Sequence, residues 1–439
     1  MRDVKDLTVA FVDHQGLYYA LARKLATFYK RVLYWDPSED PFETFNEAMI
    51  GETFPEDERF ERIDDLFLHK KECDFFIFPD SNIKAVGLQL ELESQSYPVW
   101  GPGRGTYLEQ SRELFIKTLK DNGFQVPRYE RLVGVDRLRD YLKDKEDQIV
   151  KVSRFRGTME TKRWRSWDED EAWLDMMAVK LGGCKNLLPF LVFESIETDI
   201  ELGADTYCVR GQMPSHMLDG YEAKDKGYFA ALKPAADLPP QTQAVMEAFA
   251  PILGDAGATT FWSVEIRVKG DDFYFIDATP RIPLPASASQ MELYSNLGTI
   301  FAAGAQGELV QPESVAKFSA ECVLTLDCKG PQWPSIRVPK AIEQWVKLGG
   351  VCQVNGRAWF PPLKEDHDKE IGWLVSVGDS PQEVIETMLQ HKAALPDGVE
   401  AHTESLIDLL KEIHKAQAEG IEWSPMKVPE PQVVIQADE

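Results

Sequence analysis

Two acidic residues in one predicted β-hairpin are the part of the sequence best suited to chemistry. Glu265 lies in a stretch, residues 262–269, in which apolar and polar side chains alternate as they do in a half-buried strand. A turn is predicted at residues 270–272, and Asp277 closes the apolar second strand. Two carboxylates on paired strands repel each other unless a positive charge lies between them, and Mg²⁺ prefers oxygen ligands. The hairpin therefore predicts a metal site; the alternative is that both acids face solvent on an ordinary hairpin.

The residues that follow the second strand add an anion-binding group. Thr279 and Arg281 come after Asp277 at two-residue spacing. The guanidinium of an arginine is a rigid fork of donors that fits a phosphate or a carboxylate. A metal and an anion are therefore expected next to each other at the end of this hairpin.

Positive charge is concentrated in one other stretch of the chain. Lys151 lies within the apolar run 148–153, which predicts a strand, and a lysine there must reach solvent or meet an anion. The loop at residues 153–166 carries five cations around Gly157: Arg154, Arg156, Lys162, Arg163 and Arg165. A basic loop that follows a strand and contains a glycine can form a lid over phosphate groups. The alternatives are a lysine that extends to solvent and a solvated turn.

Composition limits the class of protein. The chain has 439 residues, of which 44% are hydrophobic, and this allows two to four domains. Its net charge of −25 argues against nucleic acid or an anionic membrane as the main partner. The six cysteines form no CxxC pair, the histidines show no metal-binding spacing, and neither a signal peptide nor a membrane-spanning run is visible. We therefore expect a cytoplasmic protein with reduced thiols.

The first hundred residues alternate between apolar runs and amphipathic stretches. The runs 7–12, 31–35, 73–78 and 97–100 predict strands with helices between them, which indicates an open parallel α/β sheet. Ligands of such sheets bind at the carboxyl ends of the strands. The candidate contacts are loop residues that follow two of these runs: His14, Gln15, Gly16, Asp80 and Ser81. Ordinary turn chemistry is the alternative for them, and the absence of GxG after the first strand argues against a dinucleotide site.

The remainder of the chain predicts mixed structure. Helices are expected at 106–122, 135–145, 169–181, 241–254 and 291–303, strands at 131–133, 188–196 and 200–210, and a charged loop or edge at 221–227. Beyond residue 315, four short strands and two helices indicate an α+β cap. The tail is rich in proline and acid.

Several of these stretches resemble the ATP-grasp superfamily and, within it, the glycinamide ribonucleotide synthetases (phosphoribosylamine–glycine ligases). The similarity lies in WGPGRGTYLEQSRELFIKTLKDNGFQVPRY (100–129), VFESIETDIELGAD (192–205), EIR with FIDATPR (265–281) and IGWLVSVGDSPQEVIETM (371–388). The pieces EAKDKGYFA (222–230) and YFIDATPRIPLP (274–285) also resemble a divergent branch of synthetase-like proteins found in phage and bacteria.

The resemblance implies an ATP-grasp fold, α/β and α+β, in several domains. Residues 1–105 would form an N-terminal open parallel α/β (preATP-grasp) domain, 106–190 and 191–312 the small and large ATP-grasp subdomains, 313–420 a C-terminal α+β cap and 421–439 a tail. The implied activity is that of an ATP-dependent ligase that forms a C–N bond through an acyl phosphate. The implied substrates are a small-molecule carboxylate, such as an amino acid, and an amine, and the expected state is a monomer or a homodimer.

The resemblance also implies which residues bind ATP and a divalent metal, Mg²⁺ or Mn²⁺. The residues implied in nucleotide binding are Lys117, Lys151, Arg154, Arg156, Glu194, Ile196 and Glu201. The two lysines would neutralise phosphates, and the two arginines would belong to the lid. The backbone of Glu194 and Ile196 would contact adenine, and Glu201 would bind ribose. The implied metal ligands are Glu265, Asp277 and Thr279, and Arg281 would be the catalytic residue that holds the substrate carboxylate or the transferred phosphoryl group.

The chain departs from the family pattern in three places. The lid has one glycine and several large cations, Asp277 stands where a glutamate is usual, and Thr279 stands where an asparagine is usual. The family's contacts to phosphoribosylamine are not recognisable. A catalytically degenerate protein that binds nucleotide and regulates another process is therefore the alternative to a ligase. A biotin-type carboxylase is less favoured, because the N-terminal and cap stretches resemble the synthetase more.

Overall fold

The computed structural model describes residues 3–14, 16–37, 58–153, 161–196, 200–223, 226–327, 332–361, 369–418 and 421. Three residues expected to bind ligands, Gln15, Arg154 and Arg156, lie outside these ranges, as does the tail from residue 422.

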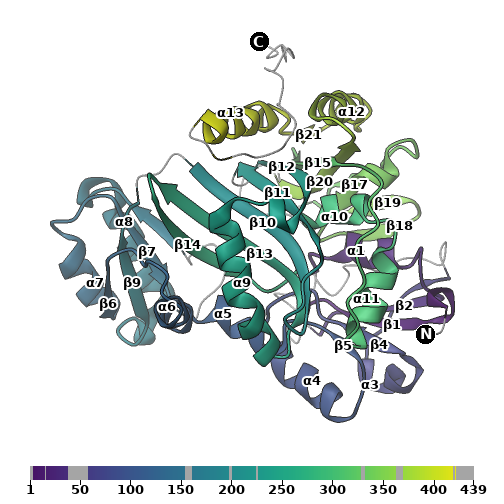
Figure 1. The fold of residues 1–439 in the computed structure, drawn as a ribbon, viewed down its shortest axis with the longest axis horizontal. Helices are drawn as coiled ribbons and strands as arrows, with labels where there is room; N and C mark the ends of the chain where they lie inside the picture. The colour runs from purple at the N-terminus through teal and green to yellow at the C-terminus, as the bar shows by residue number, and fades with distance from the viewer. Residues whose placement is uncertain are drawn as a thin grey trace. The chain divides into compact units, whose positions relative to one another are not determined.

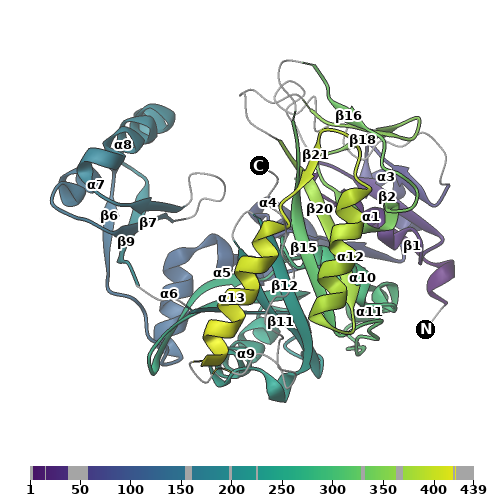
Figure 2. The same ribbon diagram turned by 90° about the horizontal axis from the view of Figure 1, so that it is seen from above.

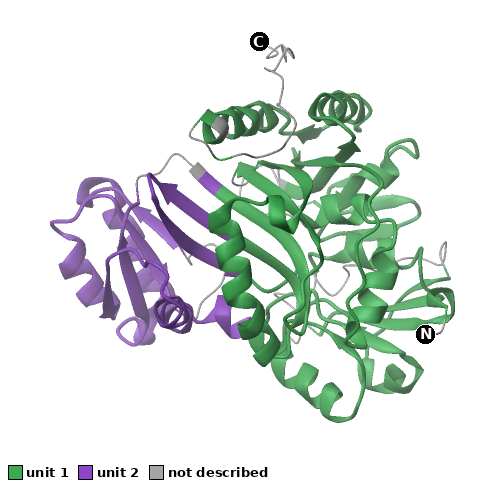
Figure 3. Cartoon of the chain, in the orientation of Figure 1, with its two compact units in different colours: residues 1–105, 202–264, 279–439 green, residues 106–201, 265–278 purple. Residues whose placement is uncertain are grey.

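The chain forms two compact units (Figure 3). Unit 1 contains residues 1–105, 202–264 and 279–439, and unit 2 contains residues 106–201 and 265–278. These units do not correspond one to one with the domains expected from the sequence, and that finer division remains a prediction.

A parallel sheet of five strands forms the N-terminal part of unit 1. Its strands are β1 (Thr8–Val12), β2 (Arg31–Trp35), β3 (Phe60–Arg62), β4 (Phe75–Ile77) and β5 (Val99–Trp100), in the order β3-β2-β1-β4-β5. Figure 1 labels β1, β2, β4 and β5. Every residue of β1 and β4 is buried, as is typical of a parallel sheet covered on both faces. The described helices between the strands are α1 (Tyr19–Leu25), α3 (Leu66–His69) and α4 (Ile83–Ser94). The expected open parallel α/β fold is therefore confirmed.

The largest sheet has nine strands. Its path is β14-β13-β10-β11-β12-β15-β20-β17, and β21 pairs with β15. The strands are β10 (Ile200–Val209), β11 (His216–Ala223), β12 (Gly227–Pro234), β13 (Thr259–Lys269), β14 (Asp272–Thr279), β15 (Phe318–Leu326), β17 (Val346–Leu348), β20 (Lys369–Gly378) and β21 (Val399–Ala401). The pairs from β10 through β11, β12 and β15 to β20 are antiparallel. The predicted hairpin is confirmed as β13 and β14.

The prediction of a charged loop or edge at residues 221–227 is wrong at both ends of that range, since residues 221–223 and 227 lie in strands; residue 226 is a turn, and residues 224 and 225 lie outside the described ranges. Tyr221 lies in β11, and β11 and β12 are central strands of the large sheet. Gly220 of β11 has no side chain, and the ring of Tyr228 takes that space, since a Cβ at residue 220 would lie 2.1 Å from its hydroxyl oxygen. Gly220 and Glu222 therefore belong to a packed strand.

Unit 2 contains a four-stranded antiparallel sheet. Its strands are β6 (Tyr129–Val133), β7 (Gln148–Val152), β8 (Thr161–Trp164) and β9 (Pro189–Glu194), in the order β6-β9-β7-β8. The helices α7 (Val135–Leu142) and α8 (Trp167–Leu181) share one apolar core with these strands. Two further helices, α5 (Thr106–Gln110) and α6 (Arg112–Asp121), replace the single helix expected at 106–122. The break lies at Ser111, whose hydroxyl accepts a 3.4 Å hydrogen bond from the Leu114 amide and caps α6.

Helices and short strands complete unit 1. The helices are α9 (Pro240–Asp255), α10 (Ser287–Leu293), α11 (Leu297–Ala305), α12 (Pro381–Ala393) and α13 (Glu404–Ala418), and a small sheet has the order β16 (Ser335–Ile336), β19 (Arg357–Trp359), β18 (Cys352–Val354). In two views, α13 lies along β11 and β12 (Figures 1 and 2). No helix in the described ranges is both long enough and apolar enough to span a membrane.

Candidate nucleotide and metal site

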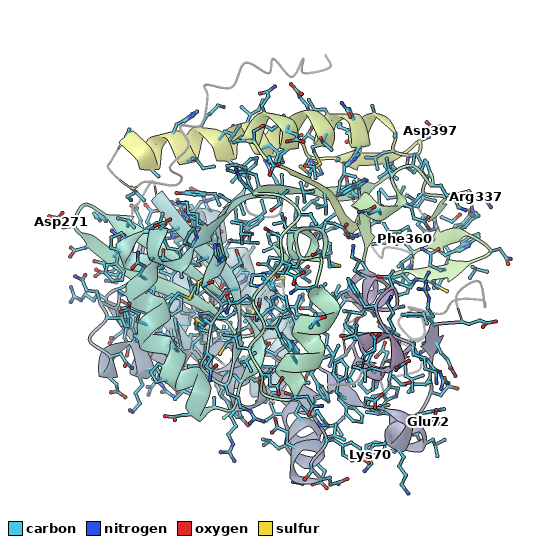
Figure 4. All side chains as sticks on the ribbon, turned by 45° about the vertical axis from the view of Figure 1, so that its right-hand side comes forward. Lys70, Glu72, Asp271, Arg337, Phe360 and Asp397 are labelled. Carbon is cyan, nitrogen blue, oxygen red and sulfur yellow. The ribbon has the colours of Figure 1, made fainter. Side chains whose placement is uncertain are left out.

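The β13–β14 hairpin places two acids in unit 2. Val264, Ile266 and Val268 of β13 are buried, and Glu265 points to the opposite face of the strand. Asp271 marks the turn between the two strands (Figure 4), and β14 then carries the chain back to Asp277.

Glu265 lies among charged groups of unit 2. Burial raises the pKa of Glu265 to about 8, the negative charges of Glu201 and Asp277 raise it further, and Lys151 acts in the opposite direction. These four residues are therefore close enough to interact electrostatically. They come from four different strands, β7, β10, β13 and β14, so only the folded unit brings them together.

Glu201, expected to bind ribose, is held by an arginine of the hairpin. The Nε and Nη2 atoms of Arg267 each lie 3.1 Å from Oε2 of Glu201. Both side chains are partly exposed, at 33% for Arg267 and 42% for Glu201. The Glu201 carboxylate thus has a fixed position beside Glu265 and remains accessible to solvent.

Arg112 is the cation of α6 that contacts the acidic residues, and reasoning from the sequence missed it. Its Nη1 and Nη2 atoms donate to Oδ1 and Oδ2 of Asp277 at 2.8 and 3.0 Å. The Arg112 side chain is only 4% exposed and that of Asp277 is 22% exposed. One turn later, Phe115 meets Phe275 edge to face, with ring centres 5.1 Å apart. The same helix face therefore contacts two alternate residues of β14.

Lys117, expected to bind phosphate, lies on another face of α6. It is five residues beyond Arg112, which places the two about 140° apart around the helix axis. Its side chain is 68% exposed and its Nζ lies 2.5 Å from Oδ2 of Asp121. The structure brings Arg112, and not Lys117, to the carboxylates.

The segment expected to contact adenine follows β9. Glu194 ends β9, with its side chain exposed and its amide donating to the Arg128 carbonyl at 2.9 Å. The Glu194 carboxylate lies 3.6 Å from the Arg128 guanidinium. Ile196 is partly buried two residues later. Both residues belong to unit 2, like the acids and the cations above.

Thr279 and Arg281 belong to unit 1. Thr279 is the last residue of β14 and is partly buried, and Nη1 of Arg281 donates to the Ile282 carbonyl at 3.1 Å. The same carbonyl accepts a 3.0 Å hydrogen bond from the hydroxyl of Tyr18, and the Ile282 amide donates to the Pro79 carbonyl at 2.9 Å. The segment after β14 is therefore fixed beside the carboxyl ends of β1 and β4.

Two of the loop residues expected at the carboxyl ends of the parallel strands, Asp80 and Ser81, lie close to this segment. Asp80 and Ser81 are buried directly after Pro79, and Gly16 has a positive φ of 65° that favours glycine. His14 is partly buried; burial, followed by the charge of Lys84, lowers its pKa to about 4. Its imidazole is therefore neutral at pH 7.

The acids of unit 2 have the donor chemistry that a hard divalent cation requires. Glu265 and Asp277 supply carboxylate oxygens, the ligands preferred by Mg²⁺. No group of three or more His, Cys, Asp or Glu side chains within the described ranges has the geometry of a metal site. The side chains of the described residues therefore supply only part of a coordination shell here, and phosphate oxygens and water would supply the rest.

The comparisons with known proteins agree with this architecture. No family model and no curated protein matches the sequence. Among solved structures, phosphoribosylamine–glycine ligase from Thermotoga maritima is similar at a TM-score of 0.63 and 14% identity, over 90% of this chain and 99% of that one. The biotin carboxylase domain of 2-oxoglutarate carboxylase from Hydrogenobacter thermophilus, solved with MgADP and bicarbonate, gives 0.62 and 12%, over 95% and 96%. L-amino acid ligase from Bacillus licheniformis gives 0.55 and 14%, over 90% and 98%. At these identities the likeness shows the fold.

Proposed function

Because this chain has the ATP-grasp fold, we propose that it is an ATP- and Mg²⁺-dependent ligase that joins a carboxylate to an amine. The proposal is supported by the names of similar structures, which include an amine–amino acid ligase, a biotin carboxylase and an amino acid ligase. It is supported equally by the charged residues of unit 2. The substrates would be small molecules, and the protein would act in the cytoplasm as a monomer or a homodimer.

The nucleotide would bind along unit 2. Lys151 and Arg112 would neutralise phosphate oxygens, since Arg112 contacts Asp277 and the charge of Lys151 acts on Glu265. Arg112 takes the role expected for Lys117, whose ammonium is held by Asp121 on an exposed face. The backbone at Glu194 and Ile196 would contact adenine, and Glu201, already oriented by Arg267, would accept the ribose hydroxyls. Arg154 and Arg156 remain proposed lid residues.

Glu265 and Asp277 would hold the divalent cation, with Thr279 as the third oxygen donor. A bound Mg²⁺ would neutralise the phosphates and orient the transferred group. The two carboxylates come from paired strands. Burial and then the charges of Glu201 and Asp277 raise the pKa of Glu265, and a cation between the two hairpin acids would relieve their repulsion.

The reaction would take two steps. A substrate carboxylate oxygen, held by Arg281, attacks the γ-phosphorus, which forms the acyl phosphate and breaks the bond to the ADP oxygen. The nitrogen of the amine then attacks the acyl carbon, loses a proton and expels inorganic phosphate, which leaves an amide. The protein contributes position and charge stabilisation in both steps, and the cationic lid would exclude the water that hydrolyses acyl phosphates.

One observation carries the proposal. Two carboxylates of the hairpin, a third on β10 and two cations from β7 and α6 come together in unit 2, in a fold that similar structures use to bind ADP. The test is the release of ADP and phosphate during a screen of carboxylates and amines with MgATP. Amide formation that requires all three reactants supports a ligase. Tight ATP binding without ADP formation for any pair supports the nucleotide-binding alternative instead.

A further inference from the structure

Arg112 and Asp277 form a pair that conflicts with the role proposed for Asp277. Both carboxylate oxygens of Asp277 accept hydrogen bonds from one guanidinium, at 2.8 and 3.0 Å. Parallel N–H···O contacts of this kind are among the strongest that a carboxylate makes. Arg112 therefore occupies the side of the carboxylate on which both oxygens can bind one partner, and a cation can take that position only if Arg112 leaves it.

The surroundings of the pair make displacement by a metal alone unfavourable. The Arg112 side chain is 4% exposed, so solvent cannot replace its partner. The described residues provide no set of three metal-binding side chains at this place. A divalent cation without nucleotide would thus exchange much of its hydration for few protein ligands and would break the two hydrogen bonds from a buried guanidinium to Asp277.

A polyphosphate removes this obstacle. The planar fork of an arginine fits phosphate oxygens as well as carboxylate oxygens. A phosphate beside Asp277 therefore offers Arg112 a second anionic partner and offers the metal the oxygen ligands that the protein lacks. Among the described residues, Arg112 is the cation that donates to both carboxylate oxygens of Asp277, whereas Lys117 is held by Asp121 on another face of α6.

We propose that Arg112 is a positioning residue that exchanges Asp277 for a nucleotide phosphate, so that Asp277 binds the metal only after nucleotide is bound. This inference rests on the proposed function, because it takes Asp277 as a metal ligand. It goes further in fixing the order of binding and in naming the residue that enforces it. The expected consequence is that removal of Arg112 makes metal binding independent of nucleotide.

The experiment measures Mn²⁺ binding to the full chain with and without a non-hydrolysable ATP analogue. Enhancement of water proton relaxation reports Mn²⁺ held by the protein separately from Mn²⁺ held by free nucleotide. The proteins are wild type, Arg112→Gln, Arg112→Lys and the control Arg131→Gln, which removes an exposed cation of the same unit that pairs with Glu113. Circular dichroism and thermal unfolding establish that each variant is folded.

The inference requires a specific pattern of affinities. Wild type and Arg131→Gln should bind Mn²⁺ at least tenfold more tightly with the analogue than without it. Arg112→Gln should bind Mn²⁺ without nucleotide at least tenfold more tightly than wild type does, and the effect of the analogue should shrink accordingly. Arg112→Lys should lie between them, because an ammonium cannot hold both carboxylate oxygens in a fork; this conservative variant carries the test if Arg112→Gln does not fold.

Two outcomes would overturn the inference, and only the second would also contradict the proposed function. If wild type binds Mn²⁺ equally with and without the analogue, or if neither Arg112 variant gains affinity, the exchange of partners is wrong while the proposed function stands. If wild type binds no Mn²⁺ even with the analogue, the metal site itself is wrong, and both proposals fall.

Discussion

Lys233 donates a 2.6 Å hydrogen bond to Asp219 inside the large sheet, where the two side chains are 4% and 0% exposed. The two residues come from the paired strands β11 and β12, which the sequence did not identify as strands. A buried ion pair of this kind holds two strands in one register, because a slip of one residue would move each side chain to the other face of the sheet.

Removal of the cation alone should destabilise unit 1. We expect Lys233→Met to lower the free energy of unfolding by about 3–5 kcal/mol, because it leaves a buried carboxylate without its cation. The double variant Lys233→Met/Asp219→Leu should recover most of that loss. Chemical denaturation of the three proteins measures the effect, and a loss below about 1 kcal/mol for the single variant would contradict it.

An exposed pair provides the matched control for that experiment. Lys117 and Asp121 are four residues apart on α6 and are 68% and 57% exposed. Because solvent screens such a pair, Lys117→Met should change the free energy of unfolding by less than about 0.5 kcal/mol.

Asp277→Asn tests the proposed metal ligand. The amide keeps the shape of the side chain but loses its charge, so Mg²⁺-dependent ADP formation should fall to background while the fold is retained. Circular dichroism checks the fold and a coupled assay measures ADP. Near-normal turnover would remove Asp277 from the metal site.

Lys151→Ala and Lys117→Ala together test which cations bind phosphate. We expect Lys151→Ala to weaken ATP binding by roughly 1–3 kcal/mol, the range for loss of a charged hydrogen bond. Lys117→Ala should leave the affinity unchanged within error, because this lysine faces away from the acidic residues. Calorimetric titration with the ATP analogue measures both. The reverse order of effects would restore the role expected for Lys117.

The hairpin that carries Glu265 could be predicted because its signal is local. In β13, buried and partly buried residues alternate with the period of a strand, and Gly270 turns the chain at a positive φ of 59°. The open parallel sheet was predictable for the same reason, since β1, β2, β4 and β5 lie in short apolar runs; β3 has the sequence FER and was not predicted.

The β11–β12 hairpin could not be predicted in this way. Asp219 and Gly220 favour turns by their intrinsic preferences, and the compensation comes from other strands: Lys233 neutralises Asp219, and the ring of Tyr228 occupies the space that Gly220 leaves. A local sequence pattern does not reveal that Lys233 and Tyr228 will pack against these two residues.

Arg112 was missed although the sequence contains a signal for it. The buried residues of α6 are Arg112, Phe115, Ile116 and Leu119, so the arginine lies in register with the apolar face. A charge at such a position needs a buried partner. Lys117 matched the family pattern better, but it lies on a face of α6 that is exposed to solvent. The partner, Asp277, lies 165 residues further along the chain, and only the structure identifies it.

The neutral imidazole of His14 should make stability depend on pH. Burial lowers its pKa from 6.5 to about 4. Between these values the unfolded chain binds a proton at His14 and the folded chain does not, so folding loses stability as the pH falls from 6.5 to 4. The contribution is up to about 3 kcal/mol.

His14→Gln, which cannot titrate, should therefore lose less stability than wild type over this window, while His216→Gln, at an exposed position, should follow wild type. Urea unfolding at pH 4 to 8 measures the difference, and parallel curves for wild type and His14→Gln would show that His14 is accessible to protons in the folded protein.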